Sequence, residues 1–382
     1  MTADFSIKPP PIAKRGDTLA QVSTPALLIE LDAFEHNIAC MADMAKQYGI
    51  ALRPHAKAHK SSVIAQKQIT AGAIGICCQK LSEAYPFVAA GISDIYISNE
   101  FVGPAKVAMA IELARHVKLS LCVDHIAQIE ALGLAADAAG VVITVLVEID
   151  IGQARCGVAR MGKLASLVDD IVRHPALRFG GLQAFHGGIQ HLATWDLRRT
   201  SAAASADKVA AYAQFLAARG IACPVITGSG TGTAEFDVAG GVFTEIQPGS
   251  YIFMDAHYGA NEWVGSAMPR HSLFIAATIM STAKDDLAVC DVGLKGVAID
   301  SGLPLLKPGQ DDQLKFIRAN DEHGVLKIID NADSVARDRL GEQVLLIPGH
   351  CDPTANLYDQ YVCIRNDRVE DIWDIDARGL SQ

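Results

Sequence analysis

Short apolar runs, each bounded by turn residues, recur through the first two thirds of the chain. The runs at 74–78, 119–123 and 142–149 are almost continuously apolar. Such runs are typical of strands that are buried on both faces, as in a parallel sheet. Alanine-rich stretches with apolar residues at helical spacing lie between most of them, for example at 82–90 and 202–219. The pattern therefore predicts a succession of strand–helix units.

Eight strands of this kind are predicted before residue 250. Eight strand–helix units in about 220 residues fit a (β/α)8 barrel better than an open, doubly wound sheet. The predicted fold class is therefore α/β, with a (β/α)8 TIM barrel as the larger domain. The predicted strands lie near 51–54, 74–78, 93–97, 118–123, 142–149, 179–185, 224–227 and 243–246.

The pattern changes at about residue 272, where apolar runs follow one another without a long helical stretch between them. Runs that are joined by turns predict a second, mainly antiparallel β domain. We therefore expect the barrel to occupy residues 25–270 and the β domain to occupy residues 271–382. The strands predicted for the β domain lie at 273–280, 287–292, 324–329, 343–347 and 360–364.

The N-terminal segment stands outside the strand–helix repeat. Residues 1–24 are proline-rich and polar, which predicts an irregular arm. A strand is predicted at 26–31, and a helix with apolar residues at helical spacing follows it to about Gln47. Asp32 lies at the start of this helix, and we expect its side chain to cap it.

Composition limits the classes of partner. The 382-residue chain has a net charge of −10 and no block of basic residues, which argues against nucleic acids and anionic membranes. No apolar run reaches the length of a membrane span, and the start of the chain lacks the apolar region of a signal peptide. The nine cysteines are scattered, mostly inside apolar runs, as expected for reduced thiols in a cytoplasmic protein.

Candidate chemistry begins with a basic octet at 53–60, which contains Lys57 just after the first predicted barrel strand. In a barrel, residues at the carboxyl ends of the strands form the active site. Arg53, Lys60 and any protonated histidine of the octet would disfavour the ammonium form of Lys57 and lower its pKa. A lysine of low pKa is a candidate for Schiff-base chemistry. The alternative is a basic surface loop on an acidic protein.

Polar or glycine-rich segments follow most of the other predicted strands. A catalytic barrel needs such residues at several strand ends, whereas a purely structural barrel needs them less. Gln79 directly follows the second strand. The segments after the fifth to eighth strands lie at 150–158, 185–191, 227–233 and 247–251.

Two of these segments, the glycine-rich turns at 228–232 and 249–250, predict a phosphate site. Backbone N–H groups that no side chain obstructs can form a nest for phosphate oxygens, and barrels often bind phosphate at their last strands. A single glycine-rich turn is commonly only a turn, but two at neighbouring strand ends favour phosphate. Lys57 together with a phosphate cup describes a site for pyridoxal 5′-phosphate (PLP).

The segment 348–354 carries the second chemical feature. If this segment is extended, His350 and Asp352 point to one side and Cys351 to the other. An imidazole and a carboxylate can form an open divalent-metal site that water or substrate completes. The alternative is a polar turn that is stabilised by a His–Asp contact.

Several motifs, in order and at suitable distances, resemble those of metal-activated D-threonine aldolases. These enzymes and the D-serine dehydratase-like enzymes share the alanine racemase fold of PLP enzymes. The resemblance runs from about residue 20 to the C-terminus. It implies a homodimer, and it implies that residues 1–31 join the C-terminal strands in one β domain. The motifs lie at 24–28, 53–60, 75–80, 147–158, 228–232, 248–251 and 348–354.

The resemblance also implies roles for individual residues. Lys57 would bind PLP covalently, and His191 would lie near the substrate hydroxyl as a catalytic residue. His350 and Asp352 would bind a divalent cation, for which Mn2+, Mg2+ and Zn2+ all suit the donor set. Phe185 stands where some relatives carry tyrosine, which removes a hydroxyl near the cofactor. The other residues implied to hold PLP are Gln79, Arg155, Thr231, Gly249, Ser250 and Tyr258, with Arg155 near the ring oxygen.

The implied function is cleavage of D-3-hydroxy-amino acids of the D-threonine type to glycine and an aldehyde. A metal that polarises the β-hydroxyl explains why a PLP fold would carry His350 and Asp352, which a racemase would not need. Relatives that dehydrate their substrates tend to have cysteine in place of Asp352, which favours an aldolase. The alternatives are a D-3-hydroxyaspartate aldolase, a dehydratase of D-serine or D-threo-3-hydroxyaspartate, and a non-catalytic PLP carrier.

Overall fold

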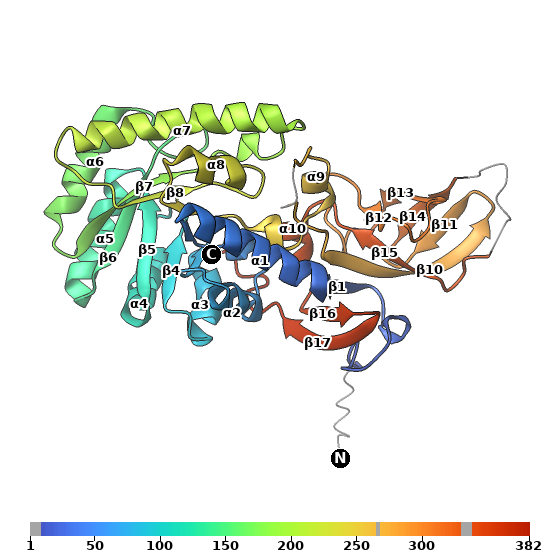
Figure 1. Cartoon of the computed structure of the whole chain (residues 1–382). Coiled ribbons are helices and arrows are strands. Elements are labelled where there is room, and N and C mark those ends of the chain that lie inside the picture. The colour runs from blue at the N-terminus through green and yellow to red at the C-terminus, as the bar shows by residue number, and fades with distance from the viewer. Residues whose placement is uncertain (1–8, 265–267, 330–337) are drawn as a thin grey trace, which may run out of the picture.

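The computed structural model of the protein describes residues 9–264, 268–329 and 338–382. Its strands form two sheets, one with eight strands and one with nine. Figure 1 shows the two sheets in separate lobes, with most of the helices gathered around the eight-stranded sheet. No helix of the described residues is long and apolar enough to cross a membrane.

The eight-stranded sheet is a barrel of parallel strands, in the order β2-β9-β8-β7-β6-β5-β4-β3. The N–H groups of Ile74 and Cys77 donate to the carbonyl oxygens of Leu52 and Pro54, both at 2.9 Å, and these bonds join the two ends of the order. The predicted α/β barrel is therefore confirmed. Its strands are β2 (Ala51–Leu52), β3 (Ile76–Cys78), β4 (Asp94–Ile97), β5 (Lys118–Val123), β6 (Ile143–Glu148), β7 (Leu177–Ala184), β8 (Val225–Gly228) and β9 (Glu245–Ile246).

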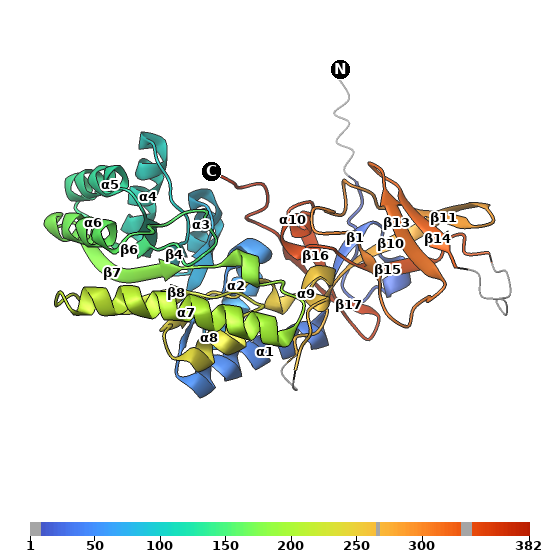
Figure 2. The same cartoon turned by 90° about the horizontal axis from the view of Figure 1, so that it is seen from above.

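Helices cover the outside of the barrel, as Figure 2 shows from above. One helix follows each barrel strand from β2 to β8, and α1 (Leu31–Tyr48), which precedes β2, packs against β2 and α8. The other helices are α2 (Ser62–Thr70), α3 (Leu81–Ala89), α4 (Pro104–His116), α5 (Ile126–Ala139), α6 (Met161–Arg173), α7 (Trp195–Ala217) and α8 (Ala234–Gly240).

The start of α1 differs from the prediction. Glu30, and not Asp32, caps the helix, because its carboxylate accepts the N–H groups of Asp32 and Ala33 at 3.3 and 2.7 Å. The strand β1 (Ala26–Glu30) runs directly into α1, so Glu30 still has extended backbone angles while Asp32 is already helical. The expected cap at Asp32 is therefore wrong, because a capping residue must lie just outside the helix.

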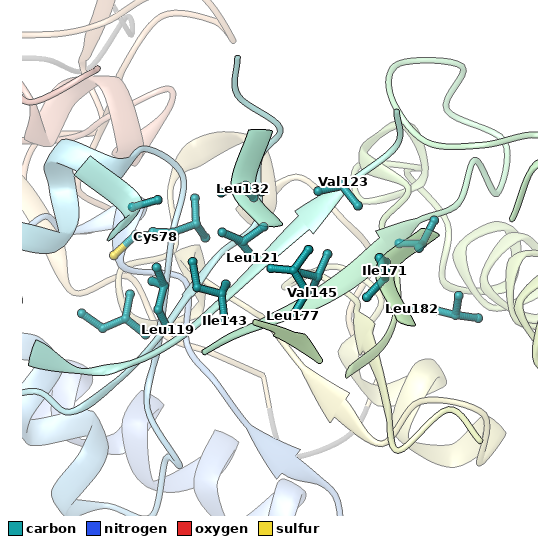
Figure 3. Close-up of a cluster of buried hydrophobic side chains, with 14 of the residues drawn as sticks. Cys78, Leu119, Leu121, Val123, Leu132, Ile143, Val145, Ile171, Leu177 and Leu182 are labelled. Carbon is teal, nitrogen blue, oxygen red and sulfur yellow. The ribbon is translucent and has the colours of Figure 1, made fainter. Parts of the chain in front are cut away.

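The main core lies between the barrel strands and the helices. Figure 3 shows Leu119, Leu121 and Val123 of β5 in this layer, with Leu132 of α5 among their neighbours. The alternate residue Cys122 points into the barrel, where it packs with a smaller buried group that includes Tyr96 and Leu146. Both faces of the strands are thus buried, which explains their continuous apolar runs.

The nine-stranded sheet forms the β domain. Its central strand β1 pairs antiparallel with β10 and parallel with β16, so the N-terminal strand does join the C-terminal strands. The order is β13-β14-β11-β10-β1-β16-β17, with β15 between β10 and β12. The remaining strands are β10 (Leu273–Lys284), β11 (Leu287–Cys290), β12 (Leu305–Leu306), β13 (Leu314–Ala319), β14 (Gly324–Ile328), β15 (Gln343–Ile347), β16 (Gln360–Arg365) and β17 (Arg368–Asp374).

Three of these strands, β12, β13 and β17, were not predicted. Polar residues alternate with buried ones along β13 and β17, because one face of each strand is exposed. Half-exposed strands lack the continuous apolar run by which the other strands are recognised. The domain boundary at 270/271 stays a prediction, although the first strand after it begins at Leu273.

The C-terminal residues return from the β domain to the barrel (Figure 1). The N–H of Ala377 donates to the carbonyl oxygen of Lys60 at 2.9 Å, and Lys60 Nζ donates to the carbonyl oxygen of Leu380 at 3.2 Å. The hydroxyl of Ser82 on α3 contacts the backbone of Gln382. The basic octet is therefore held by both lobes.

Candidate active site

A cavity of about 220 Å³ lies at the carboxyl ends of the barrel strands. It brings together residues that are far apart in the sequence, including all seven residues that the resemblance assigned to PLP. The β domain borders this region, because α10 (Cys351–Ala355) packs against the 3-10 turn η2 (Ala56–Ala58) that carries Lys57. The lining residues are His55, Lys57, Gln79, Ser98, Arg155, Gln183, Phe185, Ser229, Gly230, Thr231, Gln247, Gly249, Ser250 and Tyr258.

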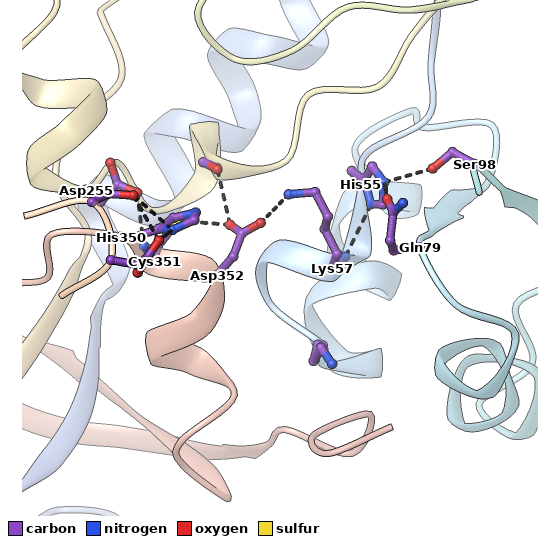
Figure 4. Close-up of polar contacts among 12 residues, drawn as sticks. His55, Lys57, Gln79, Ser98, Asp255, His350, Cys351 and Asp352 are labelled. Carbon is purple, nitrogen blue, oxygen red and sulfur yellow. Dashed lines mark hydrogen bonds and ion pairs between the residues drawn. The ribbon is translucent and has the colours of Figure 1, made fainter. Parts of the chain in front are cut away.

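Lys57 reaches across the junction between the lobes to Asp352, with which it forms an ion pair (Figure 4). Burial lowers the pKa of the Lys57 ammonium, but the Asp352 carboxylate outweighs burial and holds this pKa above its usual value. Burial conversely raises the pKa of Asp352, and Lys57 and His350 outweigh it and hold the pKa below its usual range. The expectation of a lowered Lys57 pKa is therefore wrong, because it omitted a partner 295 residues away in the sequence.

The other cations of the octet are each neutralised, so they do not act on Lys57 as expected. Arg53 pairs with Asp94 at 2.7 Å and with Glu245 at 3.0 Å. Lys60 pairs with Glu83 at 3.1 Å. Burial lowers the pKa of both His55 and His59 to about 3, so both imidazoles are neutral at neutral pH.

His55 forms one wall of the cavity. Its Nδ1 accepts the N–H of Lys57 at 3.4 Å, so the proton of the neutral ring lies on Nε2. That nitrogen is 3.1 Å from Gln79 Oε1 and 3.0 Å from the hydroxyl of Ser98 (Figure 4). The network fixes the turn that carries Lys57 against the ends of β3 and β4.

The turn after β8 has the features of a phosphate cup. Ser229 has a φ of 69°, a left-handed conformation that turns the chain sharply between two glycines. The hydroxyl oxygens of Ser229 and Thr231 are buried and form no hydrogen bond with the described residues. A Cβ at position 230 would lie 2.5 Å from Gln190 Oε1, so a larger residue would displace the Gln190 amide from its bonds to Gly232 and Thr233. Buried hydroxyl groups without a partner suit the oxygens of a bound phosphate.

The predicted metal motif, residues 348–354, is folded differently from the prediction. Cys351–Ala355 is the short helix α10, and only His350 before it has extended backbone angles. Even so, His350 and Asp352 lie next to each other, between Asp255 and Lys57 (Figure 4). The same-side arrangement thus arises at a helix start and not along a strand.

Asp255 ties the metal motif to the cavity wall. Its buried carboxylate accepts the N–H of Cys351 and the N–H of Tyr258, both at 2.9 Å. Tyr258 belongs to α9 (Ala256–Gly259) and lines the cavity. One carboxylate therefore fixes the position of α10 relative to the cavity.

His191 is not among the residues that line the cavity, but it contacts Tyr258, which is. Its ring stacks on that of His257 with 3.5 Å between the centroids, and its centroid is 4.1 Å from that of Tyr258. Burial, followed by His257 and His350, lowers the pKa of His191 to about 4. The ring is therefore neutral at neutral pH and able to accept a proton.

Sequence reasoning missed an acidic group beside Arg155. A carboxylate oxygen of Glu148 lies 4.0 Å from the Arg155 guanidinium. Glu100, Cys122 and Glu148 each place a potential ligand atom within 4.8 Å of the others, and they are the one such group of three among the described residues. Burial and the Glu100 carboxylate raise the pKa of Glu148. A glutamate inside the apolar run of β6 was the signal for this group.

Other cavity residues were also missed. Ser98 directly follows β4, so the rule of strand ends would have found it. Gln183 and Gln247 are buried polar residues whose side chains bond to each other at 3.1 Å. Phe185, which departs from the tyrosine of some relatives, lies under Arg155. The guanidinium carbon of Arg155 is 5.7 Å from the centroid of the Phe185 ring.

Two family models match the chain. The alanine racemase N-terminal domain matches residues 29–257, and a serine dehydratase domain matches residues 272–364. Together they cover the barrel and most of the β domain.

Known proteins resemble the chain over almost its whole length. A D-threonine aldolase from an Arthrobacter species is 48% identical over 98% of this chain and 97% of its own. A 3-hydroxy-D-aspartate aldolase from Paracoccus denitrificans is 38% identical, over 94% and 93%. The crystal structure of the D-threonine aldolase from Filomicrobium marinum is 43% identical, covers 96% of this chain and 98% of its own, and superposes with a TM-score of 0.92. The chain therefore belongs to the D-threonine aldolase and D-serine dehydratase-like family, which has the alanine racemase fold.

Proposed function

We propose that the protein is a PLP- and metal-dependent aldehyde-lyase that cleaves D-threonine and similar D-3-hydroxy-amino acids to glycine and an aldehyde. The observation that carries this proposal is the junction of the two lobes, where Lys57 of the barrel meets Asp352 of the β domain. A lysine beside a phosphate cup suits PLP, and a neighbouring imidazole–carboxylate pair suits a divalent cation. A PLP carrier would need the first of these features but not the second.

The residues of the cavity fit PLP. Lys57 has the amine that would attach the cofactor, and the buried hydroxyl of Thr231 would bind its phosphate together with Gly249 and Ser250. Gln79, Arg155 and Tyr258 line the remaining walls and would hold the ring. When bound, PLP supplies an electron sink for the carbanion that remains when a Cα–Cβ bond breaks.

The donor set at the junction fits a divalent cation. His350 offers an imidazole nitrogen and Asp352 offers a carboxylate, which are ligands for Mn2+, Mg2+ or Zn2+. The Lys57 ammonium pairs with Asp352 in this structure, so a bound cation would take over the charge that Lys57 now provides. The cation supplies Lewis-acid polarisation, which lowers the pKa of the β-hydroxyl of the substrate.

We assign the proton transfer to His191. Its neutral ring lies beside Tyr258, at the side of the cavity that faces the metal motif. A base must be unprotonated at the working pH to take the proton of the β-hydroxyl. The half-buried ring contacts His257 and Tyr258, and these contacts hold it in one orientation.

Product analysis tests the proposed reaction. The purified enzyme with PLP and Mn2+ is expected to convert D-threonine to glycine and acetaldehyde, and not to ammonia and a keto acid. D-3-hydroxyaspartate is tested in parallel because a relative is named for that substrate. Ammonia as the main product from either substrate would show that the protein is a dehydratase. A colourless protein without turnover would exclude both the aldolase and the dehydratase.

Thr231→Val tests the phosphate cup. The change keeps the shape of the side chain but removes the hydroxyl, which is buried and unbonded in the cavity wall. We expect PLP to bind about 10- to 100-fold more weakly, the usual range for a lost hydrogen bond to a charged group. Titration of the apoenzyme with PLP measures the effect. The matched control is Thr70→Val on the exposed end of α2, and equal PLP affinity in both variants would place the phosphate elsewhere.

We also propose a homodimer in the cytoplasm, on the strength of the family resemblance. Sedimentation equilibrium of the holoenzyme is expected to give twice the chain mass of 40.6 kDa. A monomer mass under assay conditions would contradict the dimer without affecting the proposed reaction.

A further inference from the structure

His350 has a carboxylate partner that the sequence motif does not contain. Its Nδ1 lies 2.7 Å from Asp300 Oδ2, and Figure 4 shows His350 beside Asp352. Asp300 is 50 residues upstream, in the loop that leads to β12. A carboxylate can only accept, so the proton of the neutral ring lies on Nδ1 and the lone pair lies on Nε2.

We propose that Asp300 is a positioning residue of the metal site: it fixes the tautomer and the orientation of His350, so that Nε2 is the atom that binds the cation. This inference rests on the proposed function, which makes His350 a metal ligand. Metal-binding histidines commonly donate their other ring N–H to a carboxylate, which orients the ring and raises its basicity. Asp300 supplies that partner here.

The loop of Asp300 is attached to the metal motif at three points. The hydroxyl of Ser301 lies 3.4 Å from His350 Nδ1, and it donates to the Asp300 carboxylate at 3.0 Å. The hydroxyl of Thr354 accepts the N–H of Ala298 at 3.2 Å and donates to the carbonyl oxygen of His350 at 2.7 Å. These bonds hold the carboxylate and the imidazole in one rigid unit.

Close backbone packing supplies the third attachment. A side chain at Gly349 would collide with the carbonyl oxygen of Gly302. The loop therefore lies directly against the residue that precedes His350. Only glycine permits this approach, which brings Asp300 within reach of the ring.

A stability role does not account for this contact. The side chains of Asp300 and His350 are 52% and 31% exposed. Exposed ion pairs stabilise a fold by about 0–1 kcal/mol, and salt screens them. Orientation of the ring requires only the hydrogen bond, which exposure does not prevent.

Mn2+ binding to the holoenzyme tests the proposal without an activity assay. Asp300→Ala is expected to raise the Kd for Mn2+ about 10- to 100-fold, the range for lost partners of metal-binding histidines. The Kd for PLP and the visible absorbance of bound PLP are expected to stay unchanged. The control is Asp286→Ala, which removes the same charge from an exposed position at the β10–β11 turn and is expected to bind Mn2+ like the wild type.

A double-mutant cycle separates positioning from direct binding. If Asp300 acts through His350, the variant with both His350→Ala and Asp300→Ala binds Mn2+ as weakly as His350→Ala alone. Additive losses would overturn the proposal, because Asp300 would then bind the metal or act independently of the ring. Unchanged affinity in Asp300→Ala would also overturn it. A wild-type holoenzyme that binds no divalent cation would instead contradict the proposed function.

Discussion

Lys57→Ala is expected to reduce the turnover of D-threonine about 10³-fold or more, the scale seen when a covalent catalytic group is removed. The Lys57 amine is the one lysine amine that lines the cavity among the described residues, and no other lysine could replace it without a large movement. The phosphate cup is untouched by the change, so the variant is expected to retain some PLP without covalent attachment. Steady-state rates and the absorbance spectrum of the purified variant measure both effects.

Borohydride reduction of the wild-type holoenzyme locates the attachment. Peptide mapping is expected to find the reduced pyridoxyl group on Lys57. Lys60 is the internal control, because it lies three residues away but is buried and paired with Glu83. A pyridoxyl group on Lys60, or full activity of Lys57→Ala, would contradict the assignment of Lys57.

Removal of the divalent cation is expected to stop carbon–carbon cleavage while PLP stays bound. The two proposed sites use different residues, because the proposed phosphate cup belongs to the barrel and His350 belongs to the β domain. Chelation with EDTA is therefore expected to abolish the release of aldehyde and to leave the visible absorbance of bound PLP intact. Added Mn2+ is expected to restore activity to the chelated wild type.

His350→Ala removes one of few protein ligands and is expected to weaken Mn2+ binding about 100-fold or more, beyond the range for outer-sphere partners. Added metal is not expected to restore full activity at the concentrations that rescue the wild type. The matched control is His323→Ala, which removes an exposed imidazole of the same lobe at the β13–β14 turn. Cleavage at the original rate by metal-free wild type, verified by elemental analysis, would show that His350 and Asp352 form only a structural contact.

The apolar pattern was enough to determine the architecture of the barrel. Strands such as β5 are buried on both faces, so most of their residues had to be apolar. The rule that strand ends carry the site then located Lys57, Gln79 and Thr231, which all line one cavity. Local composition also marked the turn at 228–232, because glycine-rich segments favour sharp turns, and Ser229 takes the left-handed backbone within it.

Contacts between distant segments were decided only by the tertiary structure. Residues 53–60, considered alone, predicted a low pKa for Lys57, but Asp352 of the other lobe raises this pKa. The helical fold of Cys351–Ala355 depends on Asp255, whose carboxylate accepts the N–H of Cys351. The partner of His350 is Asp300, which no spacing rule connects to it. Electrostatic and hydrogen-bond energies depend on distance in space, and sequence separation does not report that distance for side chains from different lobes.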